Sequence, residues 1–369
     1  MAASERLRMR DFLLGRQGSC SHHCRMKALT LTAYNEFSFG EVETPQAGPE
    51  ELLIAVKACG ICGSDVHGMD GSTGRRIPPV VMGHEAAGVV QEIGAAVRGK
   101  WQLGQRVTFD STLYCGKCRY CSEGLVNLCE DRRVLGVSCQ EYRQAGAFAE
   151  FVRVPERSVV SVPEGVSYEE AVFVEPTAVA LHGVRRAQVV PGDVALVVGA
   201  GIIGLLTIQA LKAAGCAKVY AADLNLGRLE LARQLGADET FPVGAGGVRE
   251  AMLERTGGEG VDVAIDCVGI GPVVDLVLNS VRKGGRVGLI GNLAPRCEFP
   301  LQVVVTRELS VFGCCASAGE YPQALEEIAS GRIQVKPLTS AIAPLEEGAE
   351  WFHRLHSAKE DLIKVILTP

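Results

Sequence analysis

The sequence predicts an α/β protein in which a β-rich, barrel-like domain is joined to a doubly wound parallel-sheet domain. At 369 residues the chain is long enough for about two domains. Residues 26–175 read as short strands separated by turns, whereas strands alternate with helices from residue 193 onward. A Gly-x-Gly-x-x-Gly run between a strand and a helix marks the start of the second domain.

The β-rich domain is predicted from apolar and β-branched runs bounded by turn-forming residues. Such runs occupy residues 28–32, 51–57, 85–93 and 106–109. Another strand-like run, at residues 146–151, precedes a predicted helix that carries Ala171, Val172 and Val174. The succession of short strands favours a closed or barrel-like arrangement.

A thiol, an imidazole and a carboxyl group suggest a metal site in this domain. Cys62, His84 and Glu85 are ligand types that zinc takes in catalytic sites, where a fourth position stays open. Alternatively, Cys59 and Cys62 form a redox pair, as in thioredoxin-like units. However, the pair follows an apolar run at residues 52–58 and ends in a Gly-Ser-Asp turn, so the metal site is favoured.

Four closely spaced cysteines predict a second metal site. They are Cys115, Cys118, Cys121 and Cys129. Four thiolates leave a tetrahedral zinc ion no open position, so this site is expected to be structural. An iron–sulfur cluster is the alternative, because its cysteine spacings are similar.

The glycine-rich run predicts a dinucleotide-binding turn after a strand at residues 193–198. Gly199 allows a tight turn, Gly201 lets a pyrophosphate approach the backbone, and Gly204 lets helix and strand touch. The helix that follows starts with free N–H groups near Ile202 and Ile203, which favour phosphate binding.

An acidic residue about 20 positions further on points to the cofactor. Asp223 ends the next strand, where a carboxylate binds the ribose diol and repels a 2′-phosphate, so NAD is favoured over NADP. Arg228 lies close enough to weaken this preference. Predicted strands at 261–269 and 284–291, with helices at 229–235 and 273–281, complete a parallel sheet.

Two runs resemble the zinc-containing medium-chain alcohol and polyol dehydrogenases. They are Gly83-His84-Glu85-x2-Gly88-x5-Gly94-x2-Val97 and Cys-Gly-Ser-Asp-Val-His at 62–67. The likeness is greatest to the sorbitol and threonine dehydrogenase branches and extends from Met26 to the C-terminus. It implies a GroES-like catalytic domain with an inserted Rossmann domain. The implied ranges are 26–176 and 316–369 for the catalytic domain, about 112–132 for its structural-zinc lobe, and 177–315 for the Rossmann domain.

The resemblance also assigns roles around the catalytic zinc. It implies that Cys62, His84 and Glu85, or Glu175 of a Glu-Pro pair, bind the metal or its water. In related enzymes a hydroxyl at Ser64 passes the substrate proton outward; alternatively, Ser64 caps the turn.

Further expected roles concern the residues after Cys62 and the strand ends near the nicotinamide. His67 either lengthens the proton relay or has no such role, and Asp65 is expected to form a turn or support a ligand. The family places Val268, Gly269 and Ile290 at the strand ends that line the nicotinamide, whereas plain core residues are the alternative.

One run departs from the family. Sorbitol dehydrogenases carry a Gly-x-Phe-Arg-Tyr run whose Arg-Tyr pair holds polyol hydroxyls, and the equivalent here is Gly313-Cys314-Cys315-Ala316-Ser317. Small residues replace the bulky polar pair, so sugar-alcohol specificity is not inherited from the resemblance.

Composition excludes several other classes. The net charge of −6 offers no basic surface for nucleic acid or an anionic membrane, and no apolar run reaches the roughly 18 residues of a membrane helix. Fourteen cysteines without a signal-peptide stretch, several of them explained as metal thiolates, favour the reducing cytoplasm. Residues 1–25 are basic and irregular and are expected to form a disordered extension.

These observations predict a zinc- and NAD-dependent enzyme that oxidises a secondary alcohol, such as a polyol, sugar alcohol or cyclitol. A threonine 3-dehydrogenase-like or general secondary-alcohol dehydrogenase is the alternative, and a non-enzymatic NAD-binding scaffold is the third possibility. The family resemblance favours a homo-oligomer, a tetramer before a dimer.

Overall fold

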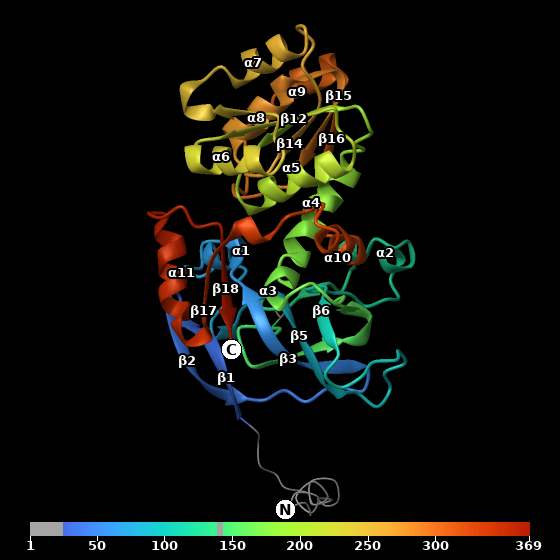
Figure 1. Ribbon diagram of the computed structural model, residues 1–369, viewed down its shortest axis with the longest axis vertical. Helices are drawn as coiled ribbons and strands as arrows, with labels where there is room; N and C mark the ends of the chain where they lie inside the picture. Colours follow the sequence, from blue (N-terminus) through green and yellow to red (C-terminus); the bar gives the residue numbers. More distant parts are fainter. Residues whose placement is uncertain (1–24, 139–142) are drawn as a thin grey trace, which may run out of the picture.

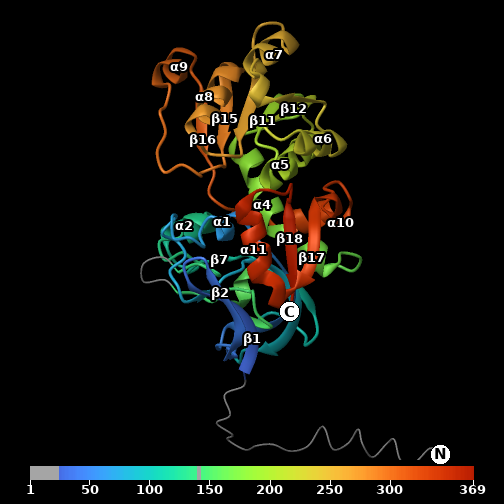
Figure 2. The ribbon, with the colours of Figure 1, turned by 90° about the vertical axis from the view of Figure 1, so that its left-hand side faces the viewer.

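The computed structural model describes residues 25–138 and 143–369. Two units stand one above the other in Figure 1, and we call them the lower unit and the upper unit. Helix α4 (Val174–Arg186) runs between them, and both views show it at the junction (Figures 1 and 2). The expected N-terminal extension lies outside the described residues except for Arg25, which opens the first strand.

The lower unit is built from two sheets and a two-stranded ribbon. One sheet has the order β2-β1-β4, and the larger one has the order β10-β6-β5-β3-β18-β17 with β9 also paired to β3. Its strands are β1 (Arg25–Ala33), β2 (Glu36–Glu43), β3 (Glu51–Gly60), β4 (Val80–Val81), β5 (Glu85–Ile93), β6 (Arg106–Phe109), β9 (Phe151–Pro155), β10 (Val159–Ser161), β17 (Thr339–Pro344) and β18 (Lys364–Thr368). The ribbon pairs β7 (Thr112–Leu113) with β8 (Arg133–Val134).

The four strands predicted between residues 28 and 109 are confirmed. Leu52, Ile54 and Val56 of β3 point into a shared core with Val107 and Phe109 of β6. The strand predicted at 146–151 is wrong in its bounds, because β9 begins only at Phe151. The sequence patterns did not predict the strands β2, β4, β7, β8, β10 and β17.

The upper unit is a six-stranded parallel sheet with the order β13-β12-β11-β14-β15-β16. Its strands are β11 (Val194–Val198), β12 (Lys218–Asp223), β13 (Glu239–Pro242), β14 (Val261–Asp266), β15 (Val281–Leu289) and β16 (Ser310–Gly313). The order is that of a doubly wound dinucleotide-binding sheet, so the predicted fold class is confirmed.

Helices cover both faces of this sheet. On one face α4, α5 (Ile202–Ala213) and α6 (Leu226–Gln234) pack against Ala195 and Val197 of β11. On the other face α7 (Val248–Arg255), α8 (Gly271–Ser280) and α9 (Leu301–Thr306) pack against Leu196 and Val198. Alternate residues of β11 therefore pack into two separate hydrophobic cores, as expected for a parallel sheet buried on both sides.

The helix predicted after residue 167 is two helices. Ser167 caps α3 (Tyr168–Ala171) through a reciprocal capping box with Glu170. Helix α4 then begins at Val174, and Pro176 lies in its first turn, where no N–H is needed.

The chain returns to the lower unit after β16. Helices α10 (Tyr321–Ala329) and α11 (Gly348–Ser357) follow, and β18 pairs antiparallel to β3 (Figure 1). Short α-helices of the lower unit include α1 (Gly63–Val66), α2 (Arg119–Ser122) and α3. No helix within the described ranges is both long and apolar enough to cross a bilayer.

Candidate active site

Strand pairing brings the three predicted ligands of the catalytic metal together. Cys62 follows the end of β3 and stands at the N-cap of α1, while Glu85 opens β5 directly after His84. β3 and β5 are antiparallel, and Gly60 pairs with Glu85 in their register. The end of one strand and the start of the other therefore meet at one edge of the sheet.

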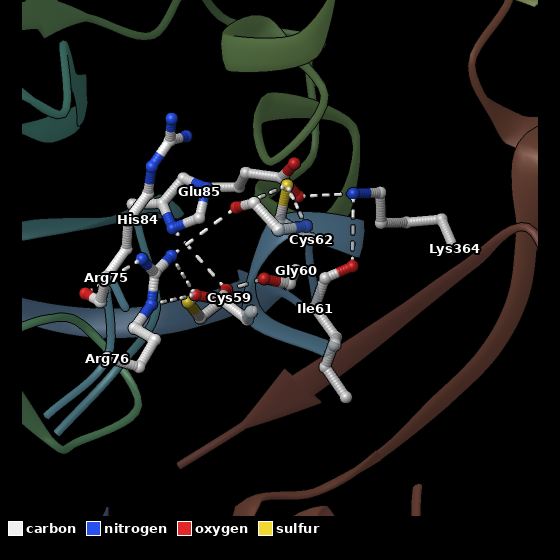
Figure 3. Close-up of polar contacts among 11 residues, drawn as sticks. Cys59, Gly60, Ile61, Cys62, Arg75, Arg76, His84, Glu85 and Lys364 are labelled. Atoms are coloured by element: carbon white, nitrogen blue, oxygen red, sulfur yellow. Dashed lines mark hydrogen bonds and ion pairs between the residues drawn. The ribbon is translucent and has the colours of Figure 1, made fainter. Parts of the chain in front are cut away.

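The donor atoms are close enough to share one ion. A ligand atom from each of Cys62, His84 and Glu85 lies within 4.8 Å of the other two. His84 and Glu85 are only 5% and 1% exposed, and the three side chains converge in Figure 3. A thiolate, an imidazole and a carboxylate at this spacing fit a zinc ion with one open position.

The carboxylate of Asp65 faces the imidazole ring of His84. Its buried carboxylate lies with Oδ2 3.4 Å from His84 Nδ1 and accepts a hydrogen bond from Arg76 Nη2 at 2.7 Å. Burial raises the pKa of Asp65, but His84 and Arg76 lower it more, so its net pKa lies below the ordinary value. With Nδ1 facing this carboxylate, Nε2 is the nitrogen left for a metal, as is usual for metal-bound histidine.

Ser64 contacts the sulfur of Cys62. Its N–H and its hydroxyl donate to Cys62 Sγ at 3.4 and 3.3 Å, and Arg76 Nη2 donates to Ser64 Oγ at 3.4 Å. Ser64 is also exposed, so its hydroxyl borders both the candidate metal site and solvent. His67 is the exposed C-cap of α1, and no hydrogen bond joins its ring to Ser64 within residues 25–138 and 143–369.

Lys364 is a charged neighbour that the sequence reading missed. It comes from β18, is 1% exposed, and its Nζ pairs with Glu85 Oε2 and donates to the Ile61 carbonyl at 3.2 Å (Figure 3). Burial lowers the pKa of Lys364, but Glu85 and Cys62 raise it more, so its net pKa is raised. A lysine at the start of the apolar run Val365–Leu367 was the available signal, since buried lysines are rare unless paired.

Glu175 lies in the first turn of α4 but outside the group formed by Cys62, His84 and Glu85. Burial and the charge of Glu85 raise the pKa of Glu175 to about 7. Burial also raises the pKa of nearby Asp110 to about 6. Glu85 is therefore the carboxylate that the geometry groups with the other two ligands, with Glu175 as a second acid near it.

The four cysteines of the lobe also converge. The sulfur atoms of Cys115, Cys118, Cys121 and Cys129 all lie within 4.8 Å of one another. The backbone N–H groups of Lys117 and Cys118 donate to Cys115 Sγ at 3.5 and 3.3 Å, and that of Cys115 donates to Cys129 Sγ at 3.2 Å. Such N–H contacts stabilise thiolates, so the set fits a closed zinc site.

The glycine-rich turn links β11 to α5 in the upper unit. A Cβ on Gly204 would lie 1.7 Å from the Gly199 carbonyl oxygen, so only glycine permits this contact of helix and turn. Ile202 and Ile203 open α5 after the Gly201 N-cap, where backbone N–H groups remain free of helix bonds.

Asp223 is fixed against this turn. Its carboxylate accepts hydrogen bonds from the N–H groups of Ala200 at 2.6 Å and Asn225 at 2.8 Å. Arg228, in α6, places Nη1 3.9 Å from the position of a Cβ on Gly201.

The three predicted nicotinamide-wall residues lie at neighbouring strand ends. Val268 follows β14 and approaches Gly199, and Gly269 lies against the backbone of Gly291. Ile290 follows β15 and lies against Gly183 of α4. The glycine-rich turn and these strand ends thus border one another.

The run at residues 313–317, which differs from the sorbitol dehydrogenase pattern, contacts the four-cysteine lobe. Cys315 follows β16, and its carbonyl oxygen accepts a hydrogen bond from Asn127 Nδ2 at 2.7 Å. Arg132 Nη1 donates to Cys315 Sγ at 2.9 Å and to the Asn127 carbonyl at 2.8 Å. The lobe therefore reaches the segment that joins the two units.

Comparisons with known proteins agree with this geometry. The alcohol dehydrogenase GroES-like domain family matches residues 48–164, and the zinc-binding dehydrogenase family matches residues 203–330. The sorbitol dehydrogenase of Bacillus subtilis (strain 168) is 32% identical over 349 residues, which cover 93% of this chain and 97% of that protein.

Two solved structures share the fold over nearly the whole chain. One, from Sinorhizobium meliloti 1021, is described as a zinc-binding dehydrogenase bound to NADP; it has a TM-score of 0.86 and 33% identity and covers 94% of this chain and 100% of its own. The other, from Escherichia coli CFT073, is described as a short chain alcohol dehydrogenase complexed with NADH; it has a TM-score of 0.86 and 30% identity and covers 94% and 99%. The protein is therefore an oxidoreductase and belongs to the zinc-containing medium-chain alcohol and polyol dehydrogenases.

Proposed function

We propose that the protein oxidises a secondary alcohol of the polyol, sugar-alcohol or cyclitol class to a ketone and transfers hydride to NAD. The observation that carries this proposal is the convergence of Cys62, His84 and Glu85, with a dinucleotide-binding turn in the adjoining unit. The likeness to a sorbitol dehydrogenase over most of both chains supports the substrate class.

The residues divide the work of this reaction. A zinc ion held by Cys62, His84 and Glu85 would supply Lewis-acid chemistry toward the substrate hydroxyl. Asp65 orients His84, and Lys364 balances the charge of Glu85. Ser64 accepts the substrate proton and passes it toward solvent, with Glu175 as a second acid and His67 as the next group of the relay.

The cofactor residues orient the ring that accepts hydride. Gly199, Gly201 and Gly204 shape the pyrophosphate turn, and Asp223 binds the adenosine ribose. Val268 and Ile290 form the wall of the nicotinamide site. The hydride chemistry itself belongs to the cofactor, and the protein supplies orientation and charge.

A second candidate follows from the run at residues 313–317. Small residues stand in this run where an Arg-Tyr pair would hold several hydroxyl groups, which favours a simpler secondary alcohol or an amino alcohol such as threonine.

A substrate panel separates these candidates. Polyols, cyclitols, L-threonine and simple secondary alcohols are each supplied with NAD, and NADH is followed by its absorbance. Turnover of polyols or cyclitols that a chelator abolishes is expected. Turnover of threonine alone would reject the polyol assignment, and NAD binding without turnover of any alcohol would favour a scaffold.

We also propose a homo-oligomer in the cytoplasm. Within the described residues β16 is an edge strand of the upper sheet, and the segment leading into it exposes Leu293, Phe299, Leu301 and Val305. An open edge beside exposed apolar side chains favours pairing with a second copy. Light scattering after size exclusion is expected to give a tetramer or dimer, and a monomer would contradict the proposal.

A further inference from the structure

An ion pair connects helix α6, which follows the strand that ends in Asp223, to the C-terminal segment of the lower unit. Arg228 Nε, in α6, lies 3.2 Å from Oδ1 of Asp361, which precedes β18 by three residues. The two side chains are 32% and 43% exposed. Because Asp361 is far from α6 in sequence, only the return of the chain to the lower unit brings the two together.

Arg228 stands where the adenosine half of a dinucleotide binds. Its Nη1 is 3.9 Å from a Cβ position on Gly201, the glycine that lets a pyrophosphate approach the backbone. In sheets of this type the acidic residue at the end of the second strand binds the ribose hydroxyls, and a nearby arginine accommodates the 2′-phosphate of NADP. Arg228 is therefore the cation that would otherwise favour NADP.

The position of Asp361 depends on the first turn of α6. A Cβ on Gly227 would lie 2.7 Å from Asp361 Oδ2, so a side chain there would displace the carboxylate. The start of a helix also attracts negative charge. Asp361 thus lies against both the start of α6 and Arg228.

We propose that Asp361 is a second determinant of the choice of NAD over NADP. It occupies Arg228 Nε and adds a negative charge beside the ribose site, where Asp223 already supplies one. A 2′-phosphate then meets two carboxylates and an arginine that is already paired. This inference rests on the proposed use of a nicotinamide dinucleotide but not on the identity of the alcohol.

Binding of adenosine fragments to the full-length protein tests the inference without turnover. Isothermal titration gives the Kd of adenosine 2′,5′-bisphosphate and of 5′-AMP for the wild type and for Asp361→Ala. We expect the bisphosphate to bind roughly fivefold more tightly to Asp361→Ala, with a clearly smaller gain for 5′-AMP, and both gains to shrink as salt is raised. Adding Arg228→Ala to this variant should abolish the gain.

Two variants serve as controls. Asp361→Glu keeps the charge and should resemble the wild type. Glu360→Ala removes the adjacent carboxylate, which pairs instead with Arg354 of α11, and should also leave both affinities unchanged. Asp361→Asn replaces the alanine variant if the latter does not fold.

Two results would overturn the inference. Equal bisphosphate affinity in the wild type and Asp361→Ala would show that the carboxylate does not select the nucleotide. If Asp361→Ala bound neither fragment, the carboxylate would be needed only to maintain the shape of the site. Absence of alcohol turnover, by contrast, would contradict the proposed function and leave the result with the fragments intact.

Discussion

Two buried charged residues hold the candidate ligands from opposite sides. Asp65 faces His84, and Lys364 pairs with Glu85. An isolated buried charge is strongly unfavourable, so each of these groups depends on its partner. The site is therefore a network in which ligand orientation and charge balance are set by residues that bind no metal themselves.

Replacing Ser64 tests the proton path. Ser64→Ala should lower kcat about a hundredfold, because the hydroxyl between the site and solvent is lost. The Kd of NADH, measured by fluorescence, should stay unchanged. Ser64→Thr, which keeps a hydroxyl, should restore most of the rate; an alanine variant with full kcat would remove Ser64 from the relay.

The buried carboxyl of Asp110 makes the free energy of unfolding depend on pH. Its pKa is raised to about 6, so the folded protein holds this proton more tightly than the unfolded chain. The resulting stabilisation is present below about pH 4, is lost as pH rises to about 6, and amounts at most to about 3 kcal/mol.

Asp110→Asn removes this titration. The amide oxygen can still accept the hydrogen bond that Thr112 N–H donates at 2.8 Å. We expect the variant to match the wild type near pH 4 and to unfold at a higher temperature at pH 7. If the unfolding temperatures of the variant and the wild type differed by the same amount at pH 4 and at pH 7, Asp110 would not be held protonated by burial.

At the scale of elements, the four-cysteine lobe connects metal binding to the segment after β16. Asn127 and Arg132 of the lobe both contact Cys315. Loss of the metal should therefore loosen more than the lobe itself, since structural zinc sites stabilise the fold around them.

Cys118→Ser tests this connection. We expect the variant to lose one zinc per chain, to unfold at a lower temperature and to show a higher KM for the alcohol, with little change in NADH affinity. Cys297→Ser, which removes an exposed free thiol in the upper unit, is the matched control. An unchanged KM in a zinc-deficient Cys118→Ser protein would show that the lobe does not position the segment at Cys315.

Local patterns predicted the elements that carry strong periodicity. The parallel strands β11, β12, β14 and β15 were evident because each holds a short apolar run, and Gly199–Gly204 marked the turn to α5, whereas β13 (Glu-Thr-Phe-Pro) carries no such run and was not predicted. β2 was missed because its sequence alternates weakly and most of its residues are not buried. The predicted ligands were found from residue type, whereas Arg76, Lys364 and Asp361 were not, because only tertiary folding brings them to their partners.

At the scale of the whole molecule, the residues proposed to bind the metal and those proposed to bind the dinucleotide lie in different units. The metal-ligand group lies in the lower unit and the dinucleotide turn in the upper one, with α4 and the pair Arg228–Asp361 linking them. The proposed substrate and cofactor sites are therefore built on separate cores, and their mutual orientation depends on the junction.

The zinc content of the purified protein tests the central claim most directly. Elemental analysis should find two zinc ions per chain in the wild type and one in Cys62→Ser, which should lose alcohol turnover but still bind NADH. A wild type with one zinc per chain, held by the four cysteines alone, or a Cys62→Ser variant that keeps both ions, would contradict a catalytic metal at Cys62, His84 and Glu85.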